Sequence, residues 1–257
     1  MNNIKLRKTG DTVAVILLCI YALLILFPIL LTFVFSTQDC FQAYVRFILW
    51  NPAYVHAFVQ SILIGLAGSC GTILVSVPAA YVFAKVPFRE RELIFYLYII
   101  VMLMPFSVTL LPQYMTARWF GIYDSLLSLI LPGIFAPMAV FLLTQIMRAF
   151  PDMYIEAARL ETDSTVYILL HIILPSIKGG VICAWAISFA ELWNLVAEPK
   201  VLLQTIDKFP LSVLLSQVTI GDSLGFAAAI LYMLPPLCIF AYFSEEILEG
   251  LGKYRLK

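Results

Sequence analysis

Six long stretches of nearly uninterrupted apolar residues restrict the fold of this 257-residue chain more than any other feature. A helix needs about 20 apolar residues to cross a hydrocarbon core of about 30 Å, and only helices or closed barrels satisfy the backbone there. The stretches are continuous rather than alternating, which favours helices. We therefore predict an all-α integral membrane protein, a single transmembrane domain over 1–257, with six membrane spans near 12–35, 57–84, 93–117, 126–147, 178–200 and 225–244.

The composition agrees with this class and excludes others. Hydrophobic residues make up 62% of the chain and charged residues 12%, which is outside the range of an ordinary soluble domain. The 16 basic and 16 acidic residues balance, so no net field attracts nucleic acid. The two histidines, His56 and His171, are far apart in the sequence, and no catalytic or metal-binding arrangement emerges from them.

The placement of the basic residues predicts how the spans are oriented. If the N-terminus is inside, the inner segments hold twelve of the 16 Lys and Arg residues, among them Lys253, Arg255 and Lys257. This satisfies the positive-inside rule. The other four lie in outer segments: Arg46, Arg118, Lys200 and Lys208. We expect both termini and the segment 151–175 to be cytoplasmic, and the loops 36–56, 118–125 and 201–224 to face outward.

The segment 151–175 is polar although it lies between two predicted spans, so it cannot lie in hydrocarbon. Pro151 suits the first turn of a helix, and Asp152 complements the positive end of that helix. Helical spacing predicts an apolar face made of Phe150, Met153, Tyr154, Ala157 and Leu160. The opposite face carries Asp152, Glu156, Arg159 and Asp163. After this amphipathic helix, either Asp163 or Ser164 can cap the next one.

Two interpretations of this amphipathic helix follow from its residues alone. It rests on the lipid headgroups, or it docks on another protein. Its charged face is mainly acidic, whereas helices that bind headgroups usually present Lys and Arg to anionic lipid. This difference favours docking.

The same segment carries a resemblance to a known family. Glu156-Ala157-Ala158, followed by Ile172 and then Leu174-Pro175, resembles the EAA loop of bacterial ABC-importer permeases. The spacing matches at every position except the glycine of that pattern, which is Thr162 here. The similarity extends over most of the chain and is closest to the carbohydrate importers, in particular the second permease of maltose-type transporters. It includes Ala80-Tyr81 through Phe88-Arg89, Pro105 with Pro112, Gly121-Ile122-Tyr123, Phe141-Leu142-Leu143, Trp193-Asn194 with Pro199, and the closing Glu249-Gly250 to Leu256-Lys257.

The resemblance implies a type I ABC importer permease in a bacterial inner membrane, with a cytoplasmic coupling helix between spans four and five. It also implies a second permease as heterodimer partner, two ATPase subunits and an extracytoplasmic solute-binding protein. The residues expected at the ATPase are Glu156, Ala157, Ala158, Arg159, Thr162, Leu174 and Pro175. Because threonine resists a positive φ and Asp tolerates it better, we expect the bend at Thr162 or shifted to Asp163, or else an ATPase partner with a correspondingly altered socket.

The chain has no nucleotide site of its own by sequence. The nearest match to a P-loop, Gly252-Lys253, is followed by Tyr254 and has Ile247 where the upstream Gly is needed. We therefore expect a non-enzymatic subunit without a cofactor, with ATP and Mg²⁺ bound by the partner ATPases.

Glu191 falls inside the predicted span 178–200, where an ionisable residue is costly unless it is paired or hydrated. It could line a sugar path together with Trp193 and Asn194, which offer a stacking face and an amide. In the alternative, Glu191 is solvated near the outer interface and Trp193 belongs to the aromatic belt. The resemblance adds that the partner permease can supply most substrate contacts.

The expected function is ATP-driven import of a carbohydrate, an oligosaccharide in particular. The same importer class with a non-sugar cargo is the first alternative, with glycerol phosphate, polyamine, peptide or an inorganic anion as cargo. A proton-coupled secondary transporter and a membrane-embedded enzyme, both using Glu191, are the others. These two leave the Glu156-Ala157-Ala158 segment unexplained and lack a second intramembrane ionisable group near Glu191.

Overall fold

The computed structural model describes residues 2–37, 42–219 and 222–252, and within these ranges it contains helices and no strands. This confirms the all-α prediction for the described part of the chain. Lys253, Arg255 and Lys257 lie outside the described residues. The chain divides into two compact parts, residues 1–55 with 217–233 and residues 56–216 with 234–257, each described separately below.

The first part is dominated by one long apolar helix. It contains α1 (Asn2–Ser36), α2 (Gln42–Val45), a π-helical turn (Arg46–Trp50) and the first half of α14 (Ser223–Tyr242). The stretch Val15–Ser36 is strongly apolar, yet its most apolar window has no residue buried within the chain. Near the end of α1, Phe35 stacks on Phe226 of α14 at 5.2 Å, and the hydroxyls of Ser36 and Tyr44 are 2.7 Å apart.

The second part contains the remaining helices, with α3 from residue 56 onward, and carries the candidate sites. Proline starts two of them, at Pro52 and Pro137, where a missing N–H costs nothing. In chain order the helices are α3 (Pro52–Lys85), α4 (Arg91–Met102), α5 (Phe106–Trp119), α6 (Leu127–Ile134), α7 (Pro137–Ala149), α8 (Asp152–Arg159), α9 (Thr165–Ile168), a π-helical turn (Leu169–Ile173), α10 (Leu174–Ser176), α11 (Lys178–Trp193), α12 (Ala197–Leu202), a 3₁₀ turn (Ile206–Lys208), α13 (Leu211–Leu215), and α15 (Ser244–Gly252).

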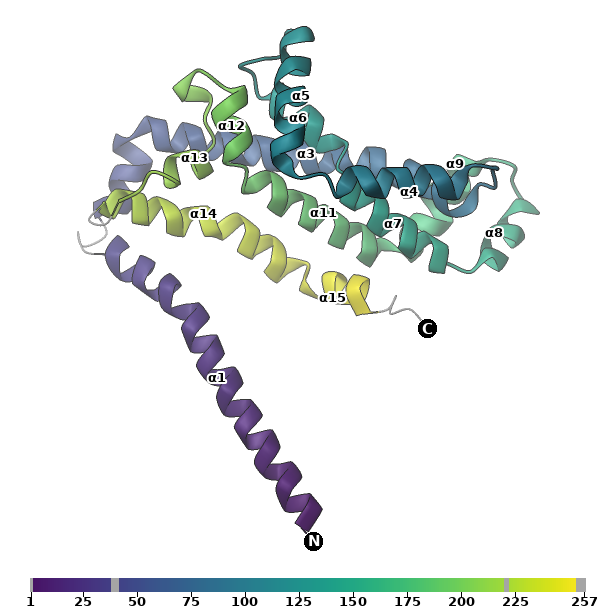
Figure 1. Ribbon diagram of the computed structural model, residues 1–257, viewed down its shortest axis with the longest axis horizontal. Helices are drawn as coiled ribbons and strands as arrows, with labels where there is room; N and C mark the ends of the chain where they lie inside the picture. Colours follow the sequence, from purple (N-terminus) through teal and green to yellow (C-terminus); the bar gives the residue numbers. More distant parts are fainter. Residues whose placement is uncertain (1, 38–41, 220–221, 253–257) are drawn as a thin grey trace. The chain divides into compact units, whose positions relative to one another are not determined.

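The core of this part is built around α11. Helices α7 and α15 both lie beside α11, and α4 lies beside α7 (Figure 1). Small residues on α3 admit side chains from α11, since a Cβ built on Gly65 would lie 2.8 Å from Phe189 and one on Gly68 would lie 2.4 Å from Leu192. Close approach at small residues is typical of helix packing in membranes.

The described helices include four segments that are long and apolar enough to cross a membrane: Val15–Ser36, Pro52–Lys85, Leu127–Ala149 and Ser223–Tyr242. Two further pairs of helices pass the same test together, which brings the number to six if each pair forms one span. These segments overlap all six predicted ranges. The structure differs from the prediction in that two of the predicted spans, 93–117 and 178–200, are interrupted and are not single straight helices.

The predicted span 93–117 consists of two helices rather than one. Helices α4 and α5 meet at an angle of 97°. Pro105 is the N-cap of α5 and has an extended backbone, with φ −64° and ψ 139°. A proline lacks the N–H that would continue the ladder of α4, and it disfavours helical geometry in the residue before it. The apolar pattern alone does not register this break, because the residues on both sides of Pro105 are apolar.

The predicted span 178–200 also ends earlier as a helix. Helix α11 stops at Trp193, and the chain resumes as α12 at Ala197. Asn194 closes α11, because its side-chain Nδ2 donates to the carbonyl of Ala190 at 2.8 Å. The backbone N–H of Asn194 donates to the same carbonyl at 3.2 Å, so the side chain adds a second donor at the end of the helix. At its other end α11 meets the segment Thr165–Ser176 at 84°.

Candidate functional site

Helix α8 is the centre of the segment 151–175. Pro151 is its N-cap, Asp152 is its first residue and Arg159 is its last. An acid at the start and a base at the end both complement the helix dipole. The Nζ of Lys85, at the end of α3, lies 2.6 Å from the Asp152 carboxylate and also donates to the Phe150 carbonyl at 2.6 Å. The start of α8 is therefore held by a cation from another helix.

The two sides of α8 have different surroundings. Ile155 and Ala158 are buried, with 6% and 9% of their surface exposed. The opposite side forms what we call the exposed face of α8, consisting of Met153, Glu156, Ala157 and Leu160. Leu160 is 90% exposed and Met153 66% exposed. The exposed face is therefore apolar around a single carboxylate.

The structure separates the two alanines that were expected to approach a partner together. Ala157 belongs to the exposed face, whereas Ala158 packs in the chain's own core. Successive residues of an α-helix are about 100° apart, so neighbouring alanines cannot both lie in the centre of one face. Glu156 and Arg159 are exposed, as expected for charged residues outside hydrocarbon.

The bend after α8 is made without a left-handed residue. Among the described residues other than glycine, positive φ occurs only at Asp124, so the chain bends near Thr162 and Asp163 without a positive φ at either residue. The Thr162 N–H instead continues the helix to the Ala158 carbonyl at 3.0 Å. Its Oγ1 then accepts the N–H of Ser164 at 3.2 Å. Ser164 caps α9 by accepting the Tyr167 N–H, which confirms one of the two predicted caps.

Leu174 and Pro175 lie at the junction with α11. Leu174 is partly buried and packs against the core cluster that includes Ile155 and Ala158, while Pro175 is exposed. The π-helical turn Leu169–Ile173 precedes them, and the 84° bend follows at Ile177. A proline that cannot donate to the preceding turn accounts for the loosened helix at this point.

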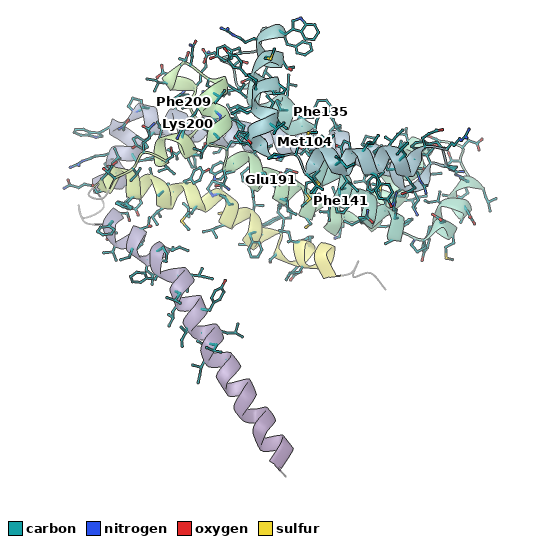
Figure 2. The ribbon with its side chains drawn as sticks, in the orientation of Figure 1. Met104, Phe135, Phe141, Glu191, Lys200 and Phe209 are labelled. Atoms are coloured by element: carbon teal, nitrogen blue, oxygen red, sulfur yellow. The ribbon has the colours of Figure 1, made fainter. Side chains whose placement is uncertain are left out.

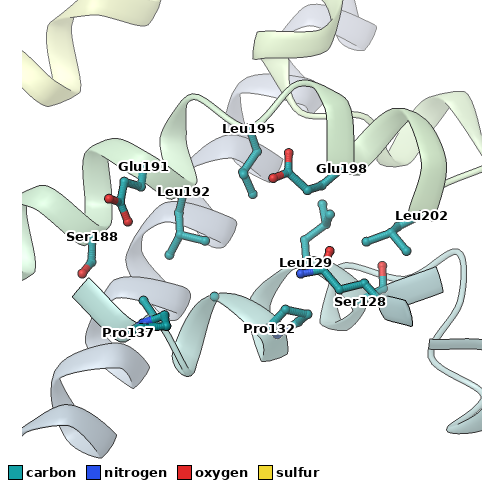
Figure 3. Close-up of a pocket in the computed structure, with 13 residues that line it drawn as sticks. Ser128, Leu129, Pro132, Pro137, Ser188, Glu191, Leu192, Leu195, Glu198 and Leu202 are labelled. Atoms are coloured by element: carbon teal, nitrogen blue, oxygen red, sulfur yellow. The ribbon is translucent and has the colours of Figure 1, made fainter. Parts of the chain in front are cut away.

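A pocket of about 450 Å³ lies between α11, α12 and α6 (Figure 3). Its polar lining consists of Gln113, Ser128, Ser188, Glu191 and Glu198. Figure 3 shows Ser188 and Glu191 on α11 and Glu198 beyond the break that follows Asn194, opposite the α6 residues Ser128 and Pro132. Figure 2 places Glu191 between the segment carrying Lys200 and Phe209 and the helix carrying Phe141. The break in the helix brings Glu198 to the same pocket as Glu191, so the expectation that Glu191 has no second ionisable group nearby is wrong.

Of the three residues proposed for a sugar path, Glu191 alone lines this pocket. Trp193 is 1% exposed and packs between Phe58 and Phe189, with ring centroids at 6.0 and 5.4 Å. Asn194 is exposed and serves as the helix cap described above. Trp193 thus contributes packing, and it offers no free face for stacking.

Two residues of importance are not singled out by the sequence. The sequence does not predict that Glu198 joins Glu191, because a continuous helix would separate residues seven positions apart by about 10 Å. Lys85 is one of the twelve basic residues predicted on the inner side, and its charge pattern indicates no further role. Its position as the last residue of a long apolar run was the available signal, but its partners lie in a different helix.

Comparison with known proteins identifies the family. The sequence model described as "Binding-protein-dependent transport system inner membrane component" matches residues 73–250. The sn-glycerol-3-phosphate transport system permease protein of Pectobacterium atrosepticum is 26% identical, over 96% of this chain and 98% of that protein. The arabinooligosaccharides transport system permease protein of Bacillus subtilis is 27% identical, over 77% of this chain and 72% of the relative. The lactose transport system permease protein of Rhizobium radiobacter is 25% identical, over 76% of this chain and 72% of the relative.

A solved structure has the same fold. One chain of a bacterial ABC transporter involved in the import of the acidic polysaccharide alginate superposes with a TM-score of 0.81, covering 93% of this chain and 97% of that one at 20% identity. The arrangement of helices, the several apolar spans and the family match agree with one another. The chain is therefore a multi-pass membrane protein that belongs to the family of inner membrane components of binding-protein-dependent transport systems.

Proposed function

We propose that this chain is the permease subunit of an ATP-driven importer of a neutral carbohydrate, an oligosaccharide in particular. It works with a second permease, two ATPase subunits that bind ATP and Mg²⁺, and an extracytoplasmic solute-binding protein. The observation that carries the choice of cargo is the lining of the pocket next to Glu191.

The polar groups of this pocket suit hydroxyl groups and disfavour anions. Glu191 and Glu198 supply acceptors, and the described residues that line the pocket include no Lys, Arg or His. The Oε1 atom of Gln113 is buried and has no hydrogen-bond partner within the described part of the chain. A buried acceptor without a partner costs about 1–3 kcal/mol, and a sugar hydroxyl in the pocket would satisfy it.

An anionic cargo fits this pocket less well than a neutral one. A phosphate or carboxylate 4 Å from either Glu would be repelled by about 4 kcal/mol at an effective dielectric constant of about 20. The arabinooligosaccharide and lactose relatives carry names of neutral sugars, in line with this charge argument. The second candidate cargo is glycerol phosphate, because the relative named for it matches 96% of the chain.

The exposed face of α8 is the proposed contact with an ATPase subunit. It combines apolar side chains with the carboxylate of Glu156, and Arg159 lies beside it at the end of the helix. Exposed apolar side chains on a helix outside the spans are typical of a protein interface. Thr162, Leu174 and Pro175 would then shape the return of the chain to α11. ATP-driven closure would favour one state of the permease through its different affinity for the two states.

The proposed orientation places both termini and the segment 151–175 in the cytoplasm, on the basis of the Lys and Arg distribution. A cysteine introduced at the exposed Glu161 tests it. In intact cells it should resist a membrane-impermeant maleimide and react after permeabilisation. Labelling in intact cells would reverse the orientation.

Uptake into proteoliposomes that contain the complete transporter tests the cargo. We expect uptake of a labelled neutral di- or oligosaccharide and no uptake of glycerol phosphate. A hydrogen bond to a charged group contributes about 1.5–3 kcal/mol, so Glu191→Gln and Glu198→Gln should each lower sugar uptake at least tenfold. Glu161→Gln, outside the pocket, should leave uptake unchanged. Uptake of glycerol phosphate without sugar uptake would sink the carbohydrate assignment.

A further inference from the structure

Lys85 joins three helices at one point. It is the last residue of α3, and only 6% of its side chain is exposed. Its ammonium donates to the carbonyl of Phe150, the C-cap of α7, and to the carboxylate of Asp152, the first residue of α8, both at 2.6 Å. Three helix termini therefore share one buried cation.

No side chain caps α8 from within its own segment. Its N-cap is Pro151, which has neither a side-chain acceptor nor an N–H. Phe150, the residue before Pro151, has an extended backbone with ψ 128°. Its carbonyl therefore lies outside the hydrogen-bond ladder of α7. Lys85 supplies the donor for this carbonyl, so the position of the start of α8 depends on a residue of α3.

The buried side of α8 strengthens the same connection. Ile155 and Ala158 belong to one apolar cluster with residues of α3 and α7. From α3 the cluster includes Val77, Ala80 and Tyr81, and from α7 it includes Leu143, Ile146 and Met147. It also includes Ile168, Leu169, Ile173 and Ile177 from the chain after α8, and Ala184 from α11. A close-packed interior transmits displacement because it deforms little. The buried side of α8 thus shares one apolar cluster with α3 and α7, next to the contacts made by Lys85.

The other end of the segment is joined differently. Between α8 and α11 lie the bend at Thr162, the π-helical turn Leu169–Ile173, Pro175 and the 84° bend at Ile177. Each interruption removes part of the continuous helical ladder that would make a rigid rod. The helical connection from α8 to α11 along the chain is therefore interrupted several times, whereas Lys85 joins the start of α8 directly to the ends of α3 and α7.

We propose that Lys85 is a positioning residue that makes α8, α3 and α7 move as one body. A displacement of α8 then reaches the membrane helices through α3 and α7, and not only along the chain through α11. This inference rests on the proposed docking of an ATPase subunit on the exposed face of α8. It assigns Lys85 a role in coupling that is separate from docking itself.

The test compares cargo moved with ATP hydrolysed in the complete reconstituted transporter. We expect Lys85→Met to lower uptake about tenfold while ATP hydrolysis stays within about twofold and the ATPase still co-purifies. Lys85→Arg, which can donate to both oxygens, should restore most of the uptake. The matched control is Arg89→Met, four residues later, with a side chain that is 94% exposed. It should behave as wild type.

A second measurement tests whether Lys85 holds the end of α3 and helix α8 at a fixed distance. Spin labels at the exposed Glu90, in the link after α3, and Glu161, after α8, report the distance between the two ends. We expect a narrow distribution in the wild type and in Lys85→Arg, and a broader one in Lys85→Met. If Lys85→Met is not recovered from the membrane, Asp152→Ala replaces it, because this side chain is 71% exposed and its loss removes one of the two contacts. A severalfold loss of uptake per ATP is then expected.

The two hypotheses fail in different ways. If the wild-type chain does not recover an ATPase, the proposed function fails, while the spin-label distances still report on Lys85. If the wild type assembles and transports, but Lys85→Met keeps its uptake per ATP and its distance distribution, the role of Lys85 is overturned. An equal loss in Lys85→Met and Arg89→Met would overturn it as well.

Discussion

The carboxylate of Asp124 accepts a hydrogen bond from the ammonium of Lys208 at 2.9 Å, which joins the loop before α6 to the 3₁₀ turn after α12. The same carboxylate accepts the Thr205 hydroxyl at 2.6 Å and the N–H groups of Gln204 and Thr205 at 2.8 and 2.9 Å. These hydrogen bonds, with that of the Thr205 hydroxyl the strongest, hold the pKa of Asp124 well below its usual range. One side chain therefore organises two loops.

This arrangement predicts how stability depends on pH. Because the pKa of Asp124 is lowered by folding, its contribution is complete above the unfolded pKa, about 3.9, and is lost as pH falls toward the folded pKa. Asp124→Asn keeps a residue that tolerates the positive φ of 56° but removes the charge. The variant should unfold at a lower temperature than the wild type at pH 7, and the difference should shrink below pH 4.

Thermal unfolding of the detergent-solubilised protein between pH 7 and pH 3 checks this prediction. Asp163→Asn, an exposed acid in the segment 151–175, serves as control and should follow the wild type. A difference between wild type and Asp124→Asn that grows on acidification would contradict it.

The contact of Leu192 with two glycines predicts an overpacking effect. A Cβ on Gly68 would lie 2.4 Å from Leu192 Cδ1, and a Cβ on Gly133 would lie 2.5 Å from Leu192 Cδ2. Gly133→Ala should therefore lower the free energy of unfolding by about 1–3 kcal/mol. Combining it with Leu192→Ala should recover part of that loss relative to Leu192→Ala alone, as a double-mutant cycle of unfolding measurements would show. Strict additivity of the two changes would mean that the side chains do not meet.

The bend at Thr162 predicts that glycine is not needed there. The Thr162 backbone has an ordinary negative φ, and its hydroxyl accepts the Ser164 N–H. Thr162→Gly should lower stability by about 0.4–1 kcal/mol, because it adds freedom to the unfolded chain. Thr162→Ser keeps the hydroxyl, so its stability should lie between that of the wild type and that of Thr162→Gly. A gain in melting temperature for Thr162→Gly would indicate strain that the backbone geometry does not show.

The exposed face of α8 predicts a loss of assembly when it is charged. Burying a leucine at an interface contributes about 1.5–3 kcal/mol, so Leu160→Glu should lower ATPase recovery about tenfold or more. The ratio of ATPase to permease after purification measures this. Ile206→Glu is the matched control, because Ile206 is 72% exposed and lies in the loop 201–224. Full recovery with Leu160→Glu would remove this face from the interface.

The predicted spans and the real helices agree where the information is local. Apolar run length predicts that a helix exists, and side-chain hydrogen bonding by Ser164 predicts where α9 begins. The break at Pro105 and the end of α11 at Asn194 are also local, but a strong apolar pattern on both sides masks them. Proline and asparagine therefore carry more weight in such spans than the hydropathy around them suggests.

The pocket and the contacts of Lys85 depend on neighbours that are distant in sequence. Trp193 illustrates the limit, because its place in the sequence beside Glu191 and Asn194 makes it a candidate for stacking a sugar, yet Phe58 of α3 and Phe189 pack against it. Nothing in the residues around Trp193 reveals which helix will pack there. Glu191 was found because a carboxylate in an apolar run stands out whatever its neighbours are.

The π-helical turn Leu169–Ile173 gives the segment 151–175 a property that its residue types do not express. A π-helical turn holds about one residue more than an α-helical turn, and one residue corresponds to a rotation of about 100°. Removing a single residue there would aim the Pro175 junction in a new direction relative to α8. The number of residues in this segment thus sets the direction in which the chain leaves α8. The segment should therefore accept many substitutions but few insertions or deletions.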